Sequence, residues 1–142
     1  MVAQVSHAPQ LGRVVATWRD RLATELMLVS GAGAFVAFVG AIAATRSAGP
    51  DTQVVEAWRM LGFLVFTGLC LLCALRPRQA PGACELVIFH KAAIAFVALT
   101  FLGGARDTRT VVAIDGAMAL IVAVAYLLAR GYTSWAALRE RR

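Results

Sequence analysis

The chain has 142 residues, of which 60% are hydrophobic and only 15% are charged, with a net charge of +6 and a mean hydropathy of +0.72. A soluble domain is usually about 45–50% apolar and about a quarter charged, so this composition excludes an ordinary soluble domain. The apolar residues fall in blocks, and no polar segment is long enough to form its own core, which indicates a single membrane domain. The sequence has no basic and aromatic pattern that would indicate nucleic-acid binding, and the positive charge is typical of loops facing anionic lipid.

Residues 1–25 are predicted to form a cytoplasmic tail that contains a helix at the membrane surface. Apolar residues recur at helical spacing from Leu11 to Leu22, and arginines fill the opposite face. Trp18 belongs to the apolar face, where an indole ring suits the headgroup layer. The alternative is a flexible basic tail.

The first predicted span covers residues 26–44 and contains no charged residue. Nineteen residues at 1.5 Å each extend roughly 28 Å, close to the thickness of the hydrocarbon core. Small residues recur along this span at every fourth position, which allows another helix to approach closely and makes this face the expected contact of a homodimer. These residues are Gly33, Ala37 and Ala41, with Ser30 and Ala34 beside them.

Three further spans are predicted, over residues 60–75, 86–104 and 111–129. The second is only about 24 Å long unless Trp58 and Arg59, directly before it, lie in the interface. Residues 130–142 are predicted to form a second basic amphipathic helix on the membrane surface. The expected fold is all-α, an antiparallel bundle of four transmembrane helices with amphipathic interfacial ends.

The distribution of basic residues predicts the orientation. Nine lysine and arginine residues lie in the tail, the middle loop and the C-terminal end, and four lie in the other two loops. Basic loops stay on the cytoplasmic side, so both termini are expected there, in a multi-pass protein of the plasma membrane or the bacterial inner membrane. A bundle this small has little interior, so we expect a homodimer or a subunit of a larger membrane complex.

Two ionisable residues, His90 and Lys91, lie about one turn inside the third span. A lysine at the centre of a membrane helix costs roughly 2.5–3.5 kcal/mol on insertion scales, so such residues call for a partner or a role. One interpretation is that Lys91 reaches out to lipid phosphate along its flexible side chain. The other is a ligand site for a polar headgroup that faces the bundle, formed by His90 and Lys91 with Tyr126 of the fourth span.

Asp115 lies one turn inside the fourth span, at the outer end, where the helix dipole favours an anion. Small residues and Tyr126 continue its face, which indicates the bundle interior. Arg59 and Arg106 lie at a similar predicted depth and are candidate partners. The two interpretations are a structural ion pair at the outer end and a proton or cation site.

Three cysteines, Cys70, Cys73 and Cys84, together with His90, contain the right atoms for a tetrahedral zinc site. However, Cys70 and Cys73 lie in a wholly apolar helix, where thiolates form with difficulty and cysteine behaves as a small hydrophobe. We therefore expect no metal or cofactor, with zinc as the alternative. The sequence also lacks a Ser/His/Asp set or an H-E-x-x-H motif, which favours a non-enzymatic role.

Two classes of function remain from the sequence. The first is an accessory subunit or a binder of a membrane lipid or other hydrophobic ligand, with His90 and Lys91 at the polar head. The alternative is a small proton- or ion-coupled transporter that acts as an oligomer, with Lys91 and Asp115 as its charged stations.

Overall fold

The computed structural model describes residues 17–101, 103–105 and 107–139. Residues 1–16 and 140–142 lie outside this part of the chain. So do residues 11–16 of the predicted N-terminal surface helix, and Arg106, one of the candidate partners of Asp115. Within the described residues the chain is helical, and it contains no strand.

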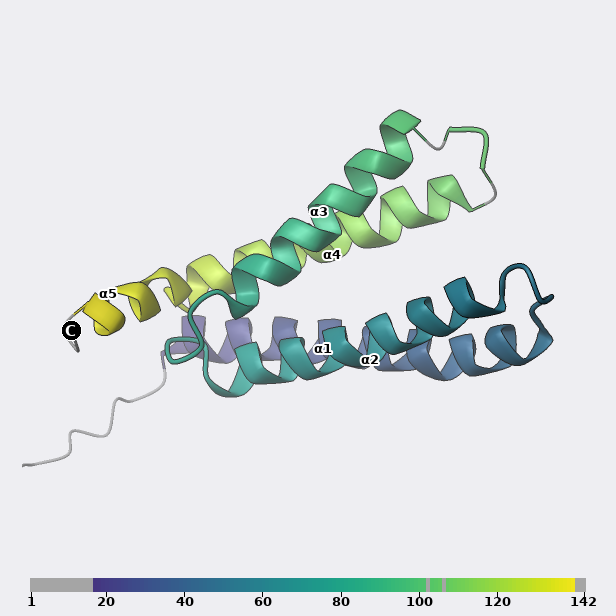
Figure 1. Ribbon diagram of the computed structural model, residues 1–142. Coiled ribbons are helices and arrows are strands. Elements are labelled where there is room, and N and C mark those ends of the chain that lie inside the picture. Colours follow the sequence, from purple (N-terminus) through teal and green to yellow (C-terminus); the bar gives the residue numbers. More distant parts are fainter. Residues whose placement is uncertain (1–16, 102, 106, 140–142) are drawn as a thin grey trace, which may run out of the picture.

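Four long helices form a bundle, as the sequence predicts (Figure 1). They are α1 (Trp18–Ser47), α2 (Gln53–Leu75), α3 (Ala83–Phe101) and α4 (Thr108–Leu128), and each is long and apolar enough to cross a membrane. The protein is therefore an all-α membrane protein with four candidate transmembrane helices.

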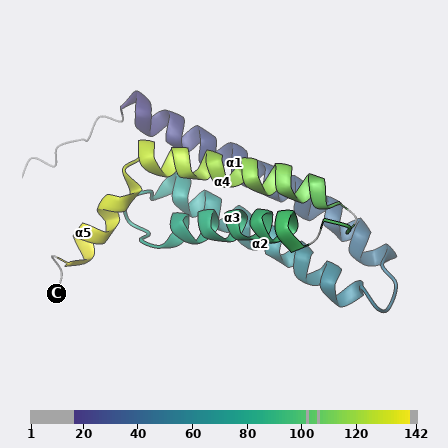
Figure 2. The same ribbon diagram turned by 90° about the horizontal axis from the view of Figure 1, so that it is seen from above.

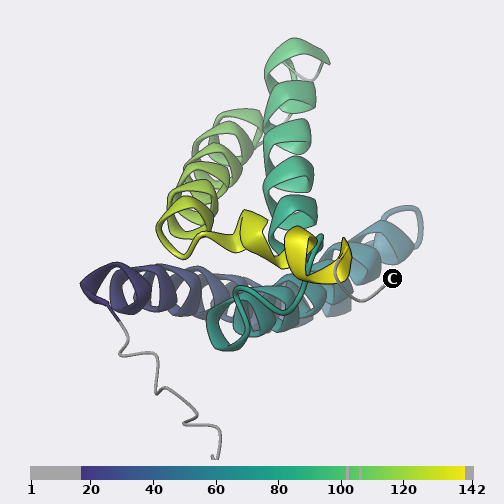
Figure 3. The same ribbon diagram turned by 90° about the vertical axis from the view of Figure 1, so that its left-hand side faces the viewer.

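The chain then ends in two short elements, the 3₁₀ turn η1 (Gly131–Thr133) and the helix α5 (Ser134–Arg139). Helix α5 lies across the end of the bundle where α1 begins and α4 ends, as the end-on view shows (Figure 3). We call this the termini end. The opposite end, where residues 48–52 join α1 to α2, is the loop end.

The bundle consists of two helical hairpins, α1–α2 and α3–α4, which form two layers (Figures 1 and 2). Helix α4 contacts α1, and α3 contacts α2. The hairpins meet at the termini end and diverge toward the loop end (Figure 1). Most of the buried core therefore lies at the termini end, around Met27, Cys73, Val87, Val122 and Ala125.

Helix α1 begins at Trp18 because Thr17 and Asp20 form a capping box. The Asp20 amide donates to Thr17 Oγ1 at 3.3 Å, and the Thr17 amide donates to Asp20 Oδ2 at 3.0 Å. No glycine or proline interrupts residues 18–26, so the helix continues without a break into the apolar stretch. The predicted boundary at residue 25 between a surface helix and a span is therefore absent, and the described part of that surface helix is the first turns of α1.

The other helices also begin before the predicted membrane spans do. Helix α2 begins seven residues before residue 60 and includes Trp58 and Arg59, while α3 and α4 each begin three residues earlier. Polar residues are readily accommodated in the first turns of a helix, so the length of the apolar stretch underestimates the length of the helix. As a result, Lys91 and Asp115 lie deeper in their helices than the sequence indicated.

Small residues form the contact between α1 and α2. A Cβ atom added at Gly31 would lie 3.3 Å from Cys70 Cβ, so only glycine fits this approach without displacement. Ser30, Ala34 and Ala41 of the predicted stripe are buried. Gly33 instead faces open space, so the stripe is shared between an inward and an outward face of α1.

Candidate functional site

The most deeply placed charges of the molecule form an ion pair between α3 and α4. Lys91 Nζ lies 2.6 Å from Asp115 Oδ1, and the two side chains are only 6% and 16% exposed. Lys91 is ten residues before the end of α3, and Asp115 is seven residues after the start of α4. In an antiparallel hairpin these positions lie at nearly the same level, about 10–15 Å from the loop end.

Helix α2 adds aromatic rings on the other side of the same ammonium group. Lys91 Nζ lies 4.4 Å from the ring centroid of Phe66 and 6.0 Å from that of Phe63. Both distances suit a cation–π interaction, which is stronger where water is excluded. Lys91 therefore contacts both hairpins, through a carboxylate of α4 and through aromatic faces of α2.

His90 has a different environment from its neighbour. Its ring lies against Phe66, with 4.7 Å between ring centroids, and the residue is exposed on the outside of the single chain. Successive helical residues point about 100° apart, so His90 and Lys91 do not face the same way. The structure brings both to Phe66 but does not place them around a shared ligand position.

Of the two arginines proposed from the sequence as partners of Asp115, Arg59 does not pair with it. Arg59 instead pairs with Glu56 on its own helix, at 2.5 Å, and Arg106 lies outside the described residues. Asp115 is about two turns inside α4 rather than one, which places it below the level of the loop-end arginines. Lys91, at that same depth, is its partner.

The chemistry of the pair follows from its burial. Breaking a buried ion pair by removing one partner typically costs 3–5 kcal/mol, because the remaining charge is left uncompensated. In the described chain, Asp115 is the one hydrogen-bond acceptor that Lys91 contacts, although an ammonium group has three donors. The ammonium group therefore retains donors for a water molecule or a polar ligand, and the carboxylate can take up a proton or a cation and release the lysine.

Tyr126, the third predicted ligand residue, belongs to a separate polar cluster at the termini end. Its hydroxyl donates to Glu85 Oε1 at 2.7 Å, and the indole Nε1 of Trp135 donates to the same oxygen at 2.7 Å. Glu85 is six residues before Lys91 on α3, about 9 Å along the helix axis. This cluster attaches α4 and α5 to the start of α3. No sequence pattern selected Glu85, which directly precedes the predicted span over residues 86–104.

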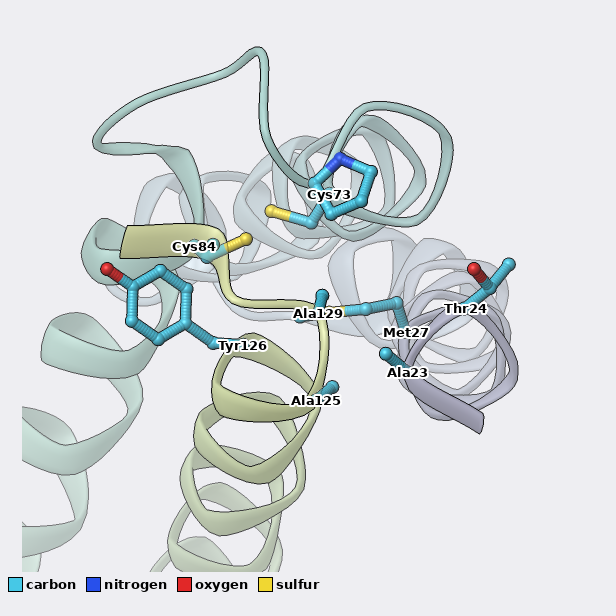
Figure 4. A pocket seen from close by; sticks show the side chains of 10 residues that line it. Ala23, Thr24, Met27, Cys73, Cys84, Ala125, Tyr126 and Ala129 are labelled. Atoms are coloured by element: carbon cyan, nitrogen blue, oxygen red, sulfur yellow. The ribbon is translucent and has the colours of Figure 1, made fainter. Parts of the chain in front are cut away.

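The cysteines lie in the core near this cluster (Figure 4). Cys73 and Cys84 come from different hairpins, both are buried, and their side chains point toward each other. Cys70 lies one turn away, against Gly31. Across the described residues, no group of three or more His, Cys, Asp or Glu side chains is arranged to hold a metal ion. His90, the predicted fourth zinc ligand, lies against Phe66 instead.

These features define a small four-helix membrane protein with a buried Lys–Asp pair inside its second hairpin, α3–α4. In comparisons with protein-family models, curated proteins and solved structures, none matches this chain. Of the residues selected from the sequence, the structure joins Lys91 to Asp115 and places Tyr126 and Arg59 elsewhere.

Proposed function

We propose that the protein is a small ion-coupled membrane transporter in which the Lys91–Asp115 pair binds and releases a proton or a small cation. The observation that supports this is the pair itself, enclosed partway along helices that are long enough to span a bilayer. Ionisable residues inside spans are costly, and they commonly mark proton relays and ion pathways. Of the two classes of function considered, transport makes direct use of both charges.

The arrangement of the hairpins supplies two parts that can move relative to each other. Each hairpin is packed along its length, whereas the two hairpins diverge toward the loop end (Figure 1). Lys91 is held by Asp115 within its own hairpin and by Phe66 of the other. Proton or cation binding at Asp115 weakens the first contact and leaves the ammonium group facing the aromatic rings. That change in charge is coupled to the contact between the hairpins.

Transport in this mechanism predicts charge movement that depends on Asp115. Protein in liposomes on a solid-supported membrane is exposed to rapid jumps in proton, Na⁺ or K⁺ concentration, and the transient current is recorded. We expect a current for at least one of these ions, and we expect Asp115→Asn to reduce it at least about tenfold.

The matched control is Glu56→Gln, which removes one carboxylate charge from an ion pair near the loop end. Its current should equal that of the unsubstituted protein. Absence of current for all three ions, or equal currents in folded Asp115→Asn and unsubstituted protein, would refute the proposal. The pair would then be a purely structural contact.

A binding site for a lipid tail inside the bundle has less support. The pocket in Figure 4 holds only about 10 Å³ for a water-sized sphere, which is about the space of one water molecule. Lys91, the predicted contact for a headgroup, is only 6% exposed, so a lipid headgroup on the surface of the bundle does not reach it. A lipid contact is better supported on the surface of the termini end, where arginines line an open hollow.

The proposed orientation and assembly follow from surface features. Basic residues are more numerous at the termini end, so we place that end in the cytoplasm and the protein in a plasma or bacterial inner membrane. Self-association as a homodimer is placed on the outward face of α1, where Gly33 leaves space for another helix. The described basic residues of the termini end are Arg19, Arg21, Arg76, Arg78, Arg130 and Arg139.

A further inference from the structure

An open hollow of about 550 Å³ lies at the termini end, at the junction of the two hairpins. Three arginines from three separate segments line it: Arg19 from the first turn of α1, Arg78 from the loop after α2, and Arg130 from the end of α4. We call this the arginine hollow. Trp18 and Leu128 supply apolar surface to the same hollow.

Arg78 contacts two of the segments that line the arginine hollow. Its guanidinium group pairs with Asp20, and its Nε donates to the carbonyl oxygen of Ala129 at 2.8 Å. Asp20 is fixed in turn by the Thr17 capping box. These contacts join α1, the α2–α3 loop and α4, and they neutralise the one acidic residue of the hollow.

The other two arginines of the hollow, Arg19 and Arg130, have no acidic partner among the described residues. Within the described chain, neither Arg19 nor Arg130 forms an ion pair or a side-chain hydrogen bond, and the Arg19 guanidinium lies 5.6 Å from the centroid of the Trp18 ring. Arg130 has a left-handed backbone, with φ of 53°. The following residue, Gly131, is packed so closely on the Tyr126 ring that any Cβ atom would collide with it. The backbone that carries Arg130 is therefore held in one position.

The hollow lies where lipid headgroups are expected. Arg130 directly follows the apolar stretch of α4 and so lies at the hydrocarbon boundary, whereas Trp18 lies eight residues, or about 12 Å of an upright helix, before the apolar stretch of α1 begins at Leu26. The hollow between them therefore spans the headgroup layer, which is about 5–8 Å thick. Tryptophan is enriched at this level, and arginine binds phosphate oxygens in pairs through its planar fork of N–H groups. An occupant should thus be anionic at one end and apolar at the other.

We propose that the arginine hollow binds the phosphate group of one anionic phospholipid. Arg19 and Arg130 contact the phosphate oxygens, and the acyl chains extend along Leu128 toward the apolar surface of α4. This site is separate from the Lys91–Asp115 pair and does not depend on the proposed transport. It also differs from the headgroup site predicted at His90 and Lys91.

Native mass spectrometry of the detergent-purified full chain tests this site, with phosphatidylglycerol and phosphatidylcholine of identical acyl chains as probes. One molecule of phosphatidylglycerol should bind at least about tenfold more tightly than phosphatidylcholine. The double variant Arg19→Ala/Arg130→Ala should lose about thirtyfold in affinity for phosphatidylglycerol, since each arginine near an anionic lipid contributes about fivefold.

The matched control is Arg46→Ala/Arg109→Ala, which removes two positive charges from the loop end instead. It should leave the affinity for phosphatidylglycerol unchanged. If the alanine variant does not fold, Arg19→Lys/Arg130→Lys keeps the charge but removes the planar fork, and its affinity should fall about threefold. The proposal is overturned by equal binding of the two lipids or by equal loss in the control. It is also overturned if inorganic phosphate binds as tightly as phosphatidylglycerol, which would indicate a site for a soluble anion.

Discussion

The two hairpins solve the same packing problem differently. In the α1–α2 hairpin, the helices approach closely through small residues, with Gly31 against Cys70. Among the described residues, no ion pair joins the middle of α1 to the middle of α2. In α3–α4, polar contacts join the helices, Lys91 to Asp115 and Glu85 to Tyr126. Lipid offers no hydrophobic drive for helix association, so close packing and polar contacts are the two available means.

On the proposed function, the difference assigns a fixed structural role to α1–α2 and the ion-binding role to α3–α4. Close packing of small residues requires no buried charge and does not depend on protonation or bound ions, which suits the first hairpin to a fixed role. A buried ion pair depends on protonation and on bound ions, so in the proposed transport the second hairpin is the part that responds to them. Substitutions that act on one hairpin and not on the other can therefore test this comparison.

The largest effect is expected at the ion pair. Asp115→Leu should destabilise the protein by about 3–5 kcal/mol because it leaves the Lys91 ammonium group buried without a counter-charge. Adding Lys91→Met should restore most of that loss, to within about 1 kcal/mol of the unsubstituted protein. Reversible unfolding in mixed micelles measures both variants. Equal stability of the single and double variants would show that the charges are not coupled.

A cross-link between the hairpins should have the next largest effect. Oxidation of Cys73 and Cys84 to a disulfide encloses a short loop and should stabilise the bundle by about 3 kcal/mol, if the bond forms without strain. Intact mass, with a loss of two hydrogens after diamide treatment, reports the bond, and unfolding in micelles reports the stability. Cys70→Ser should retain the cross-link, whereas Cys84→Ser should abolish it. A bond that survives Cys84→Ser would contradict the pairing.

A smaller effect is expected from the first hairpin. Gly31→Ala introduces a Cβ atom into the contact with Cys70 and should destabilise the protein by about 1–2 kcal/mol. Gly33→Ala, two residues away, meets open space and should be neutral or slightly stabilising. The same unfolding measurement compares them. If the two variants lose the same stability, the cost arises from the glycine backbone and not from the helix contact.

The smallest effect is expected at the polar cluster of the termini end. Tyr126→Phe removes one hydrogen bond to Glu85 but leaves the one from Trp135, so we expect a loss of about 1 kcal/mol. The ion current should be unchanged, because Tyr126 is separate from the Lys91–Asp115 pair. A loss of current in a folded Tyr126→Phe variant would show that the polar cluster at the termini end also takes part in ion transport.

The helices could be predicted from the sequence because apolar blocks of the right length occur four times. Their beginnings could not, since an apolar stretch does not show how far a helix extends into polar residues. Thr17 and Asp20 do contain a recognisable capping pattern, S/T-x-x-D, and this would have placed the start of α1 correctly.

Lys91 and Asp115 were each recognisable as charges inside spans, but their pairing was not. Errors of three residues at the beginnings of α3 and α4 moved both residues toward opposite ends of the bundle. With the helix bounds as the structure has them, Lys91 and Asp115 lie ten and seven residues from the loop that joins α3 to α4. Antiparallel helices place such residues at nearly one level, so the pairing depended on bounds that the apolar stretches alone did not show. The arginine hollow had no sequence signal, since Arg19, Arg78 and Arg130 are far apart in the chain and converge only where the hairpins meet.

The length of α1 has a consequence for where the protein works best. Its 30 residues extend about 45 Å, half as long again as a typical hydrocarbon core. The surplus raises the first turn above the acyl chains, by an amount that depends on bilayer thickness and on tilt. Lipids with longer acyl chains should bring their phosphates closer to the level of Arg19. If the arginine hollow binds a phospholipid as proposed, its occupancy should therefore rise with membrane thickness.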